Sequence, residues 1–410
     1  MLRRILHIFQ DIWNVYLAEV RHIFGDGGVL LLFFVATLLY PLIFSVVYHS
    51  EMVRDIPVAV VDESCSADSR RFIHKVDATP EMQVSFKCCS MAEAERLMRQ
   101  HEVRGIFYFP RDYATRIATG QTGRLCLFCD MSSFLYYRSV YSGASAVLLD
   151  EMKSIEIDRC TLSGMSSYEA EGQVTPIAYD DVKLFCAPGG FTSFLVPALL
   201  VLVVHQTLFL GIGVLFGTSQ EKKNRMLIPE HLRRNSMVRL TLGKAVAYLL
   251  LYIPLIFINL FVLPRLFGLP HIGHISDLIW FLFPFLLATI FFSLTVASFF
   301  RERDGVILVC IVFSIVLLFV SGTVWPQCNM PAFWRYFGYL FPSTHGVQGF
   351  IRINSMGATL REVHFEYHML WSQVIFYFFT TCLAFRIVEY RRKLKRDKIV
   401  ARSMRKMPEK

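Results

Sequence analysis

Long apolar runs, separated by polar stretches, dominate the pattern of residues along the chain. A helix needs about 20 consecutive apolar residues to cross the hydrocarbon part of a bilayer. Six runs meet this requirement, at residues 28–48, 191–217, 240–263, 277–300, 305–326 and 366–388. The pattern therefore predicts an α-helical polytopic membrane protein with six transmembrane helices. The first helix is expected within residues 27–49 and the other five within residues 191–389.

The amino-terminal segment, residues 1–26, has a different pattern. Apolar residues such as Ile5, Phe9 and Trp13 recur at helical spacing among basic and other polar residues. The segment is too polar to cross a bilayer, but a helix with one apolar face can lie in the membrane surface. We therefore expect an interfacial amphipathic helix here.

Between the first two predicted spans, residues 50–190 consist of short alternating segments. Apolar runs at 56–61, 105–109 and 124–130 are typical of strands. Helical stretches lie between them, and one begins where Ser90 and Glu93 have the spacing of a capping box. The expected order is strand, helix, strand, helix, strand, helix, strand, followed by a long helix at 134–158. This order predicts an inserted mixed α/β domain with helices packed on a small sheet.

Seven of the ten cysteines fall in this inserted domain. They are Cys65, Cys88, Cys89, Cys126, Cys129, Cys160 and Cys186. An odd number cannot all pair within one chain, so a full disulfide framework is not expected. Cys126 and Cys129 have C-x-x-C spacing, but on a strand they point to opposite faces. Buried thiols are therefore favoured over a redox pair.

The net charge of +9 is informative only together with the positions of the basic residues along the chain. They gather in the amino-terminal segment, in the stretch 218–244, at Arg301 and Arg303, and in the tail 390–410. Six spans place all four segments on one face, and Lys and Arg accumulate on the cytoplasmic face. Both termini and the loop 218–239 are thus predicted to be cytoplasmic.

The same count places the inserted domain 50–190 and the loop 327–365, which has few basic residues, on the extracytoplasmic side. Orientation together with contacts to anionic lipid explains the basic tail. Nucleic acid is therefore not expected among the partners.

Motifs for chemistry on the chain itself are missing. The Gly-Lys pair Gly243-Lys244 has Val238 where a phosphate-binding loop requires its first glycine. Neither a G-x-S-x-G nor an H-E-x-x-H motif occurs, and His and Cys do not cluster at metal-ligand spacing. We therefore expect no enzyme, no cofactor and no metal site. Energy for any transport would come from a partner subunit or from an ion gradient.

With these elements in place, the chain resembles an ABC-2 type transporter permease, of the export and multidrug subgroup with a large domain after the first span. The resemblance extends over nearly the whole chain. The residues that carry it are Ile56–Asp62 (IPVAVVD), Val103–Pro110 (VRGIFYFP) with Asp112 and Tyr113, Leu242-Gly243-Lys244, and the segment from Ser321-Gly322 through Pro326, Met330-Pro331, Phe341-Pro342 and Gly346 to Arg352.

The first cytoplasmic loop departs from the family pattern. Members usually carry E-[KR]-E-x-G-T-x-E there, whereas this chain has EKKNRMLIPE at 221–230, with Lys223 in place of the second acid and no Gly-Thr pair. The resemblance implies a coupling helix that docks on an ATPase subunit. The coupling candidates are Glu221, Lys222, Arg225 and Glu230. The alternative is a solvated, positively charged loop.

His205 and Gln206 lie near the middle of the second predicted span. Polar groups at that depth are costly and tend to face protein or water. They are candidates for a transport pathway. The alternative is a hydrogen bond to a neighbouring helix.

The resemblance implies a permease half that pairs with a second chain, as a homodimer or a heterodimer, in a bacterial inner membrane. Cytoplasmic ATP-binding subunits would drive export of a hydrophobic or amphipathic substrate, and a periplasmic adaptor could meet the external domain. One alternative is a membrane receptor or scaffold that uses this domain to bind a ligand. Another is an ion-driven carrier, but no internal repeat supports it.

Overall fold

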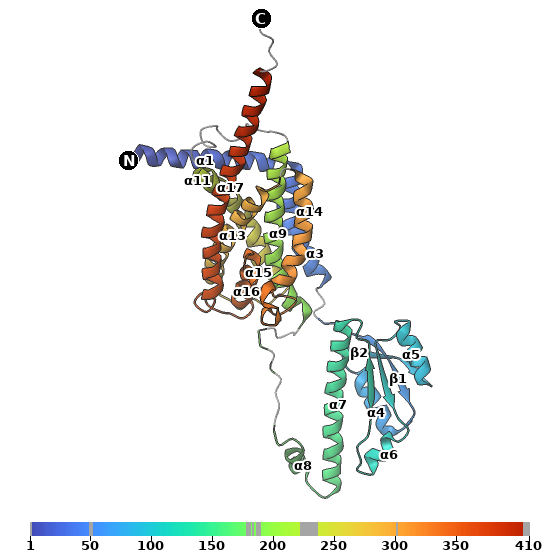
Figure 1. The fold of residues 1–410 in the computed structure, drawn as a ribbon. Coiled ribbons are helices and arrows are strands. Elements are labelled where there is room, and N and C mark those ends of the chain that lie inside the picture. The colour runs from blue at the N-terminus through green and yellow to red at the C-terminus, as the bar shows by residue number, and fades with distance from the viewer. Residues whose placement is uncertain are drawn as a thin grey trace. The chain divides into compact units, whose positions relative to one another are not determined.

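The computed structural model describes residues 2–48, 52–177, 182, 184–185, 190–221, 237–300 and 302–404. The chain forms two compact units. One, here called the helical unit, comprises Met1–His49 and Leu184–Lys410, and the other, the α/β unit, comprises Ser50–Lys183. Figure 1 shows the helices and strands of each.

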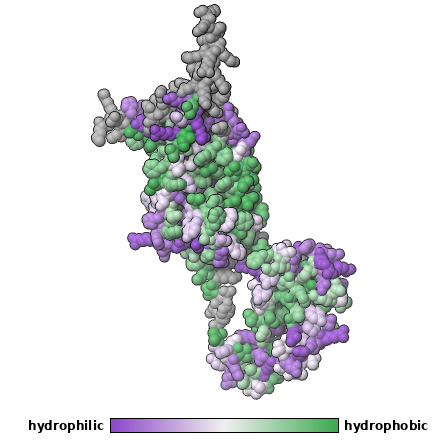
Figure 2. Space-filling view, viewed as in Figure 1, coloured by the Kyte–Doolittle hydropathy of each residue, from purple (hydrophilic) through white to green (hydrophobic). Residues whose placement is uncertain are grey.

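Six helices among the described residues are long and apolar enough to cross a membrane. They are Gly27–Val47 (α2, Gly27–Leu30; η1, Leu31–Ala36; α3, Thr37–Val47), α9 (Phe191–Glu221), Met237–Leu266 (α11, Met237–Phe257; η2, Ile258–Val262; α12, Leu263–Leu266), α13 (Ile275–Ala297), α14 (Arg303–Val320) and His364–Arg391 of α17 (His364–Met404). All six predicted spans are therefore confirmed as helices. On the face shown in Figure 2, apolar residues cover the middle of the helical unit, and polar residues gather toward its two ends.

The fifth predicted span ends earlier than expected, at Val320 rather than at 326. Gly322 has a φ of +84°, which an L side chain rarely adopts, so the chain leaves the helix there. The Ser321 hydroxyl lies 2.9 Å from that of Thr323 and fixes the turn. A run of apolar residues alone did not reveal this stop.

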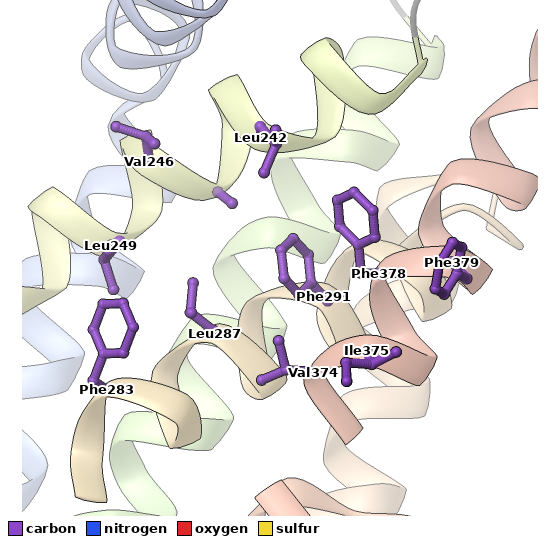
Figure 3. Close-up of a pocket in the computed structure, with 11 residues that line it drawn as sticks. Leu242, Val246, Leu249, Phe283, Leu287, Phe291, Val374, Ile375, Phe378 and Phe379 are labelled. Atoms are coloured by element: carbon purple, nitrogen blue, oxygen red, sulfur yellow. The ribbon is translucent and has the colours of Figure 1, made fainter. Parts of the chain in front are cut away.

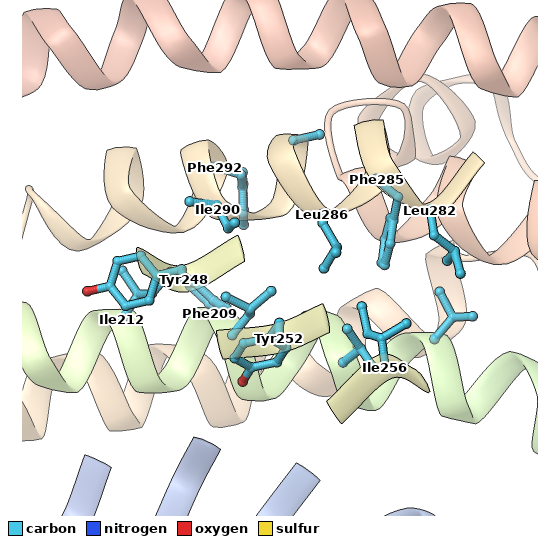
Figure 4. Close-up of a cluster of buried hydrophobic side chains, with 14 of the residues drawn as sticks. Phe209, Ile212, Tyr248, Tyr252, Ile256, Leu282, Phe285, Leu286, Ile290 and Phe292 are labelled. Atoms are coloured by element: carbon cyan, nitrogen blue, oxygen red, sulfur yellow. The ribbon is translucent and has the colours of Figure 1, made fainter. Parts of the chain in front are cut away.

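α9 lies at the centre of the helical unit and is the most buried of the six candidate spans. Its apolar side chains meet those of α11 and α13 in one continuous core (Figure 4). Glycines allow close packing around this core, because a Cβ at Gly211 would lie 2.1 Å from the ring of Phe33. A Cβ at Gly349 of α16 (Pro342–Asn354) would lie equally close to Phe281 of α13.

At one end of the bundle, α1 (Leu2–Phe24) runs across the ends of the spans (Figure 1). The predicted helix in residues 1–26 is therefore present. We call this end the basic end, because it holds Arg239, Arg303 and the start of the basic extension of α17. The opposite end holds a short 3-10 turn, η3 (Gln327–Asn329), and the helices α15 (Ala332–Gly338) and α16.

In the α/β unit, four strands form a sheet in the order β2-β1-β3-β4. β1 (Ile56–Asp62) pairs in parallel with β2 (Met82–Cys88) and β3 (Gly105–Phe109), and β4 (Cys126–Cys129) pairs with β3 in antiparallel fashion. The expected order of strands and helices is confirmed. The helices are α4 (Ala67–Asp77), α5 (Met91–Arg99), α6 (Tyr113–Ala118), α7 (Phe134–Leu162) and α8 (Ser167–Val174), of which α8 was not expected.

Side chains that alternate along β1 build a separate core on each face of the sheet. Val58 and Val60 pack with residues of α4 and α7, whereas Ala59 and Val61 pack with residues of α5. Because successive residues of a strand point to opposite faces, one short apolar strand serves both cores. This explains why the run at 56–61 contains no polar residue.

The expectation of two buried thiols on the last strand is wrong for Cys126. Its side chain is exposed, and Cys129 is half-buried on the face that packs with the α4 and α7 core. Exposed and half-buried residues alternate along β4, so the face that carries Cys126 and Phe128 is uncovered. Burial raises the pKa of the Cys129 thiol to about 11, so it remains protonated at neutral pH. None of the nine described cysteines is in a disulfide.

Candidate functional site

The loop that follows α9 begins on a residue bound to another helix. The Glu221 carboxylate accepts a hydrogen bond of 2.6 Å from the backbone N–H of Arg303, the first residue of α14. Helix amino termini favour negative charge, because their first N–H groups have no partner within the helix. One turn earlier, a Cβ on Gly217 would lie 2.9 Å from Cα of Arg303. The end of α9 and the start of α14 are therefore fastened together.

The other coupling candidates, Lys222, Arg225 and Glu230, lie outside the described residues. Glu221 thus has a partner within its own unit and is not a freely solvated loop residue. Its role as a helix cap was not evident from the sequence, because the two positions are 82 residues apart.

α11, which follows this loop, is fastened to α1 by three successive contacts. Asp11 forms an ion pair with Arg239 at 2.7 Å. Val15 packs directly against Gly243, where an added Cβ would lie 2.6 Å from the Cβ of Val15. Glu19, the next residue at the same spacing, accepts hydrogen bonds from the Lys244 ammonium and from the Tyr248 hydroxyl. Residues four apart lie on one face of a helix, so 11, 15 and 19 form one stripe along α1. We call these contacts the α1–α11 seam.

Glu19 is an acidic residue of the helical unit that is almost fully buried, with 3% of its surface exposed. Burial alone would raise the pKa of its carboxyl, but the Lys244 ammonium and hydrogen bonds from Lys244 and Tyr248 outweigh this and lower it. Glu19 is therefore ionised and forms a buried ion pair with Lys244, at 2.5 Å.

The first span joins the same region. Asp26 caps α2 by accepting from the N–H groups of Gly28 and Val29. Seven residues on from Asp26, the Phe33 ring makes edge-on contacts with the rings of Tyr248 and Tyr252. The basic end therefore connects α1, the first span, α9, α11 and α14.

His205 and Gln206 point to different helices. The Gln206 side-chain amide donates to the Ser314 carbonyl of α14 at 3.3 Å, which is the simpler of the two roles expected for it. His205 is fully buried beside the rings of Phe209 and Phe292. Neither of its ring nitrogens has a hydrogen-bond partner among the described atoms. The structure does not bring the two side chains together on one surface.

A pocket of about 630 Å³ lies between α11, α13 and α17 (Figure 3). Every side chain that lines it is apolar. These are Leu242, Ala245, Val246, Leu249, Phe283, Leu287, Phe291, Val374, Ile375, Phe378 and Phe379. Neither His205 nor Gln206 lines it. In the sequence, residues 242, 245, 246 and 249 have the spacing of one apolar face of a helix. The other faces of this helix are also mostly apolar, so the spacing alone does not reveal a pocket.

In the α/β unit, two acidic residues at the ends of strands stabilise the turns that follow. Asp62 accepts from the N–H groups of Ser64 and Cys65 and from the Ser69 hydroxyl. Asp130 accepts from the N–H of Ser132 and from the Arg104 guanidinium. No group of three or more His, Cys, Asp or Glu in the described part of the chain could hold a metal ion.

Comparison with known proteins identifies the family. The family model described as ABC-2 family transporter protein matches residues 28–383, from the first span to well into α17. No curated protein matches the chain. The match extends over both units and over all six membrane-spanning helices. The chain therefore belongs to the ABC-2 transporter family, and is the multi-pass membrane component of an ABC transporter.

Proposed function

We propose that this chain is the permease half of an exporter that is driven by ATP hydrolysis on a separate cytoplasmic subunit. The observation that carries the proposal is the anchoring of the loop between α9 and α11. Glu221 at its start binds α14, and α11, which begins just after its end, packs closely on α1 where Gly243 meets Val15. A displacement imposed on this loop would reach four helices at once. A docking site for a moving ATP-binding subunit requires such a connection.

The remaining partners follow from the charge distribution and the family. The basic end faces the cytoplasm of a bacterial inner membrane, with both termini on that side. The α/β unit is then extracytoplasmic and can meet a periplasmic adaptor. A second permease chain, identical or related, completes the pathway. The chain itself hydrolyses nothing, since no phosphate-binding loop precedes Gly243-Lys244.

The substrate class is hydrophobic or amphipathic. The pocket between α11, α13 and α17 supports this, because it offers apolar contacts and no polar group (Figure 3). Binding sites for such molecules are concave and mostly apolar. His205, buried without a hydrogen-bond partner, remains a candidate for the pathway in the assembled transporter.

One observation favours the alternative, a receptor or scaffold whose external domain binds a partner. Phe134, Tyr141 and Leu148 of α7 are exposed and recur every seven residues. They therefore form one apolar stripe, and such exposed stripes mark interaction sites. In an exporter the same stripe suits a periplasmic adaptor, so it is compatible with both functions.

The decisive experiment purifies the chain from its own membranes in mild detergent and assays the bound proteins for ATP hydrolysis. An ATP-binding subunit should copurify, and hydrolysis should depend on the complex. Reversing two loop charges, Arg225→Glu with Glu230→Lys, should lower ATP-driven transport at least about tenfold by weakening docking. Glu221 is spared because it caps α14.

The matched control is Arg391→Glu in the basic extension of α17, which should change transport less than about twofold, because an exposed charge there contributes little. Unchanged transport in the loop variant would contradict the docking role. A chain that copurifies with no ATP-binding subunit would favour the receptor or scaffold.

A further inference from the structure

The ion pair between Glu19 and Lys244 is unusual in its degree of burial. Glu19 is 3% exposed and Lys244 9%, and the two charged atoms lie 2.5 Å apart. The Tyr248 hydroxyl donates to the second oxygen of the same carboxylate. The desolvation of a buried pair can outweigh its attraction, so such pairs are weak evidence for stability. Their best-attested use is to fix the register of two packed elements.

The helices around this pair are packed too closely to slide past each other. A Cβ at Gly243 would lie 2.6 Å from Cβ of Val15 and 3.0 Å from the carbonyl oxygen of Ile12. Val15 is fully buried. A shift of α1 by one turn would replace this glycine contact with a larger side chain. It would also separate Glu19 from both of its partners.

Tyr248 extends the contact to the first span. Its ring meets that of Phe33 at a centroid distance of 5.9 Å, and Phe33 fills the space left by Gly211 of α9. Phe33 is fully buried. One cluster therefore joins the helix that lies across the basic end to α11 and to the base of the first span.

We propose that Glu19 and Lys244 are positioning residues that lock α1 to α11, so that movement of the loop 222–236 carries α1 and the base of the first span with it. The consequence for transport rests on the proposed function, in which this loop receives the movement of the ATP-binding subunit. The lock itself is a property of the chain alone. The two parts can therefore be tested separately.

The first test measures transport per ATP hydrolysed in the purified complex. Glu19→Gln leaves the Lys244 charge unpaired and should lower this ratio at least about tenfold while ATP hydrolysis continues. Exchanging the charges, Glu19→Lys with Lys244→Glu, should restore the ratio to within about threefold, because the pair is remade. A purely structural role would lower the yield of complex without changing the ratio.

The matched control is Asp11→Asn on the same two helices. The Asp11–Arg239 pair is of similar length, but Arg239 is 35% exposed, so solvent screens it. The ratio should change less than about twofold. If the Glu19→Gln chain does not assemble into the complex, Tyr248→Phe is tested instead. This variant loses the hydrogen bond from the Tyr248 hydroxyl to Glu19 and keeps the aromatic ring. It should lower the ratio about threefold.

The second test measures hydrogen exchange of the α1 amides in the full chain in detergent micelles, without any ATP-binding subunit. Exchange in α1 should rise at least about tenfold in Glu19→Gln or Tyr248→Phe and not in Asp11→Asn. Unchanged exchange in both would overturn the lock. Raised exchange with an unchanged transport ratio would overturn its role in coupling. A wild-type complex without ATP-driven transport would refute the proposed function, and the exchange result alone would then decide whether the lock exists.

Discussion

Each buried Lys or Glu side chain in the described part of the protein has a partner from another element. In the α/β unit, Glu151 of α7 is 2% exposed and receives both Arg71 and Lys75 of α4. Burial would raise the pKa of Glu151, but hydrogen bonds from Lys75 and Arg71 lower it overall, so it is ionised. The partners in these two pairs lie 80 and 76 positions apart in the sequence. A single sequence shows the charges but not the pairing, and the seam residues Glu19 and Lys244 escaped prediction for the same reason.

The lowered pKa of Asp130 predicts how the stability of the α/β unit depends on pH. Hydrogen bonds from Ser132, then the Arg104 guanidinium, lower its pKa from 3.8 to about 2. A carboxyl whose pKa is lower in the folded state stabilises the fold above its unfolded pKa, and this contribution is lost as the pH falls through the folded pKa. Between pH 4 and pH 2, the α/β unit should therefore lose stability.

The measurement is hydrogen exchange of the β3 and β4 amides in the full chain over that pH range, corrected for the intrinsic pH dependence of exchange. Asp130→Asn should flatten the loss, because no proton can then bind at this position. The matched control, Asp112→Asn, removes an exposed carboxylate and should leave the loss in place. A wild-type profile that is flat from pH 4 to pH 2 would contradict the prediction.

At the scale of elements, the sequence best predicted those features that depend only on residues close to one another in the chain. Short apolar runs located three of the four strands, and long apolar runs located the spans. The Ser90 cap is present, but only half of the predicted box forms. Ser90 accepts from Glu93 N–H, whereas the Glu93 carboxylate accepts from Cys89 N–H. The π-helical turns η1 and η2 were not predicted, because an apolar run looks the same whether its helix is regular or locally widened.

The close packing of α9 at Gly211 predicts that adding a single methyl group there lowers the stability of the helical unit. In Gly211→Ala the added Cβ would lie 2.1 Å from the Phe33 ring, which is fully buried against Tyr248 and Tyr252. The ring cannot move away, so overpacking should cost about 1–3 kcal/mol of stability, more than the helix propensity of alanine returns.

Thermal unfolding in detergent checks this expectation. The control is Gly27→Ala, where no heavy atom lies within 4 Å of the added Cβ. It should leave the melting temperature unchanged or raise it slightly, because alanine favours the helix. Equal melting temperatures for the two variants would show that the contact between α9 and the first span is loose.

At the scale of the whole molecule, the order of apolar runs was enough to predict a six-span membrane protein with an inserted α/β unit. The family came instead from a resemblance in short motifs such as Ile56–Asp62 and Val103–Pro110. For the coupling candidates, the sequence predicted the loop in which they lie but not the contacts that they make. Of the four, Glu221 proved to be bound to α14, and the other three lie outside the described residues. The apolar pocket and the α1–α11 seam arise from contacts between distant helices, which the apolar pattern of each helix cannot specify.

Orientation in the membrane is the remaining property that the whole chain determines, and cysteine labelling tests it. Lys and Arg favour the cytoplasmic side, so the α/β unit should face outward. Cys65, Cys89 and Cys126 are exposed in that unit. They should react with a membrane-impermeant maleimide added to intact spheroplasts. In a cysteine-free background, Arg391→Cys on the exposed extension of α17 should react only after the membrane is permeabilised. Labelling of Arg391→Cys in intact spheroplasts, with protection of Cys65 restored to the same background, would reverse the orientation. The loop after Glu221 would then lie outside and could not receive a cytoplasmic ATP-binding subunit.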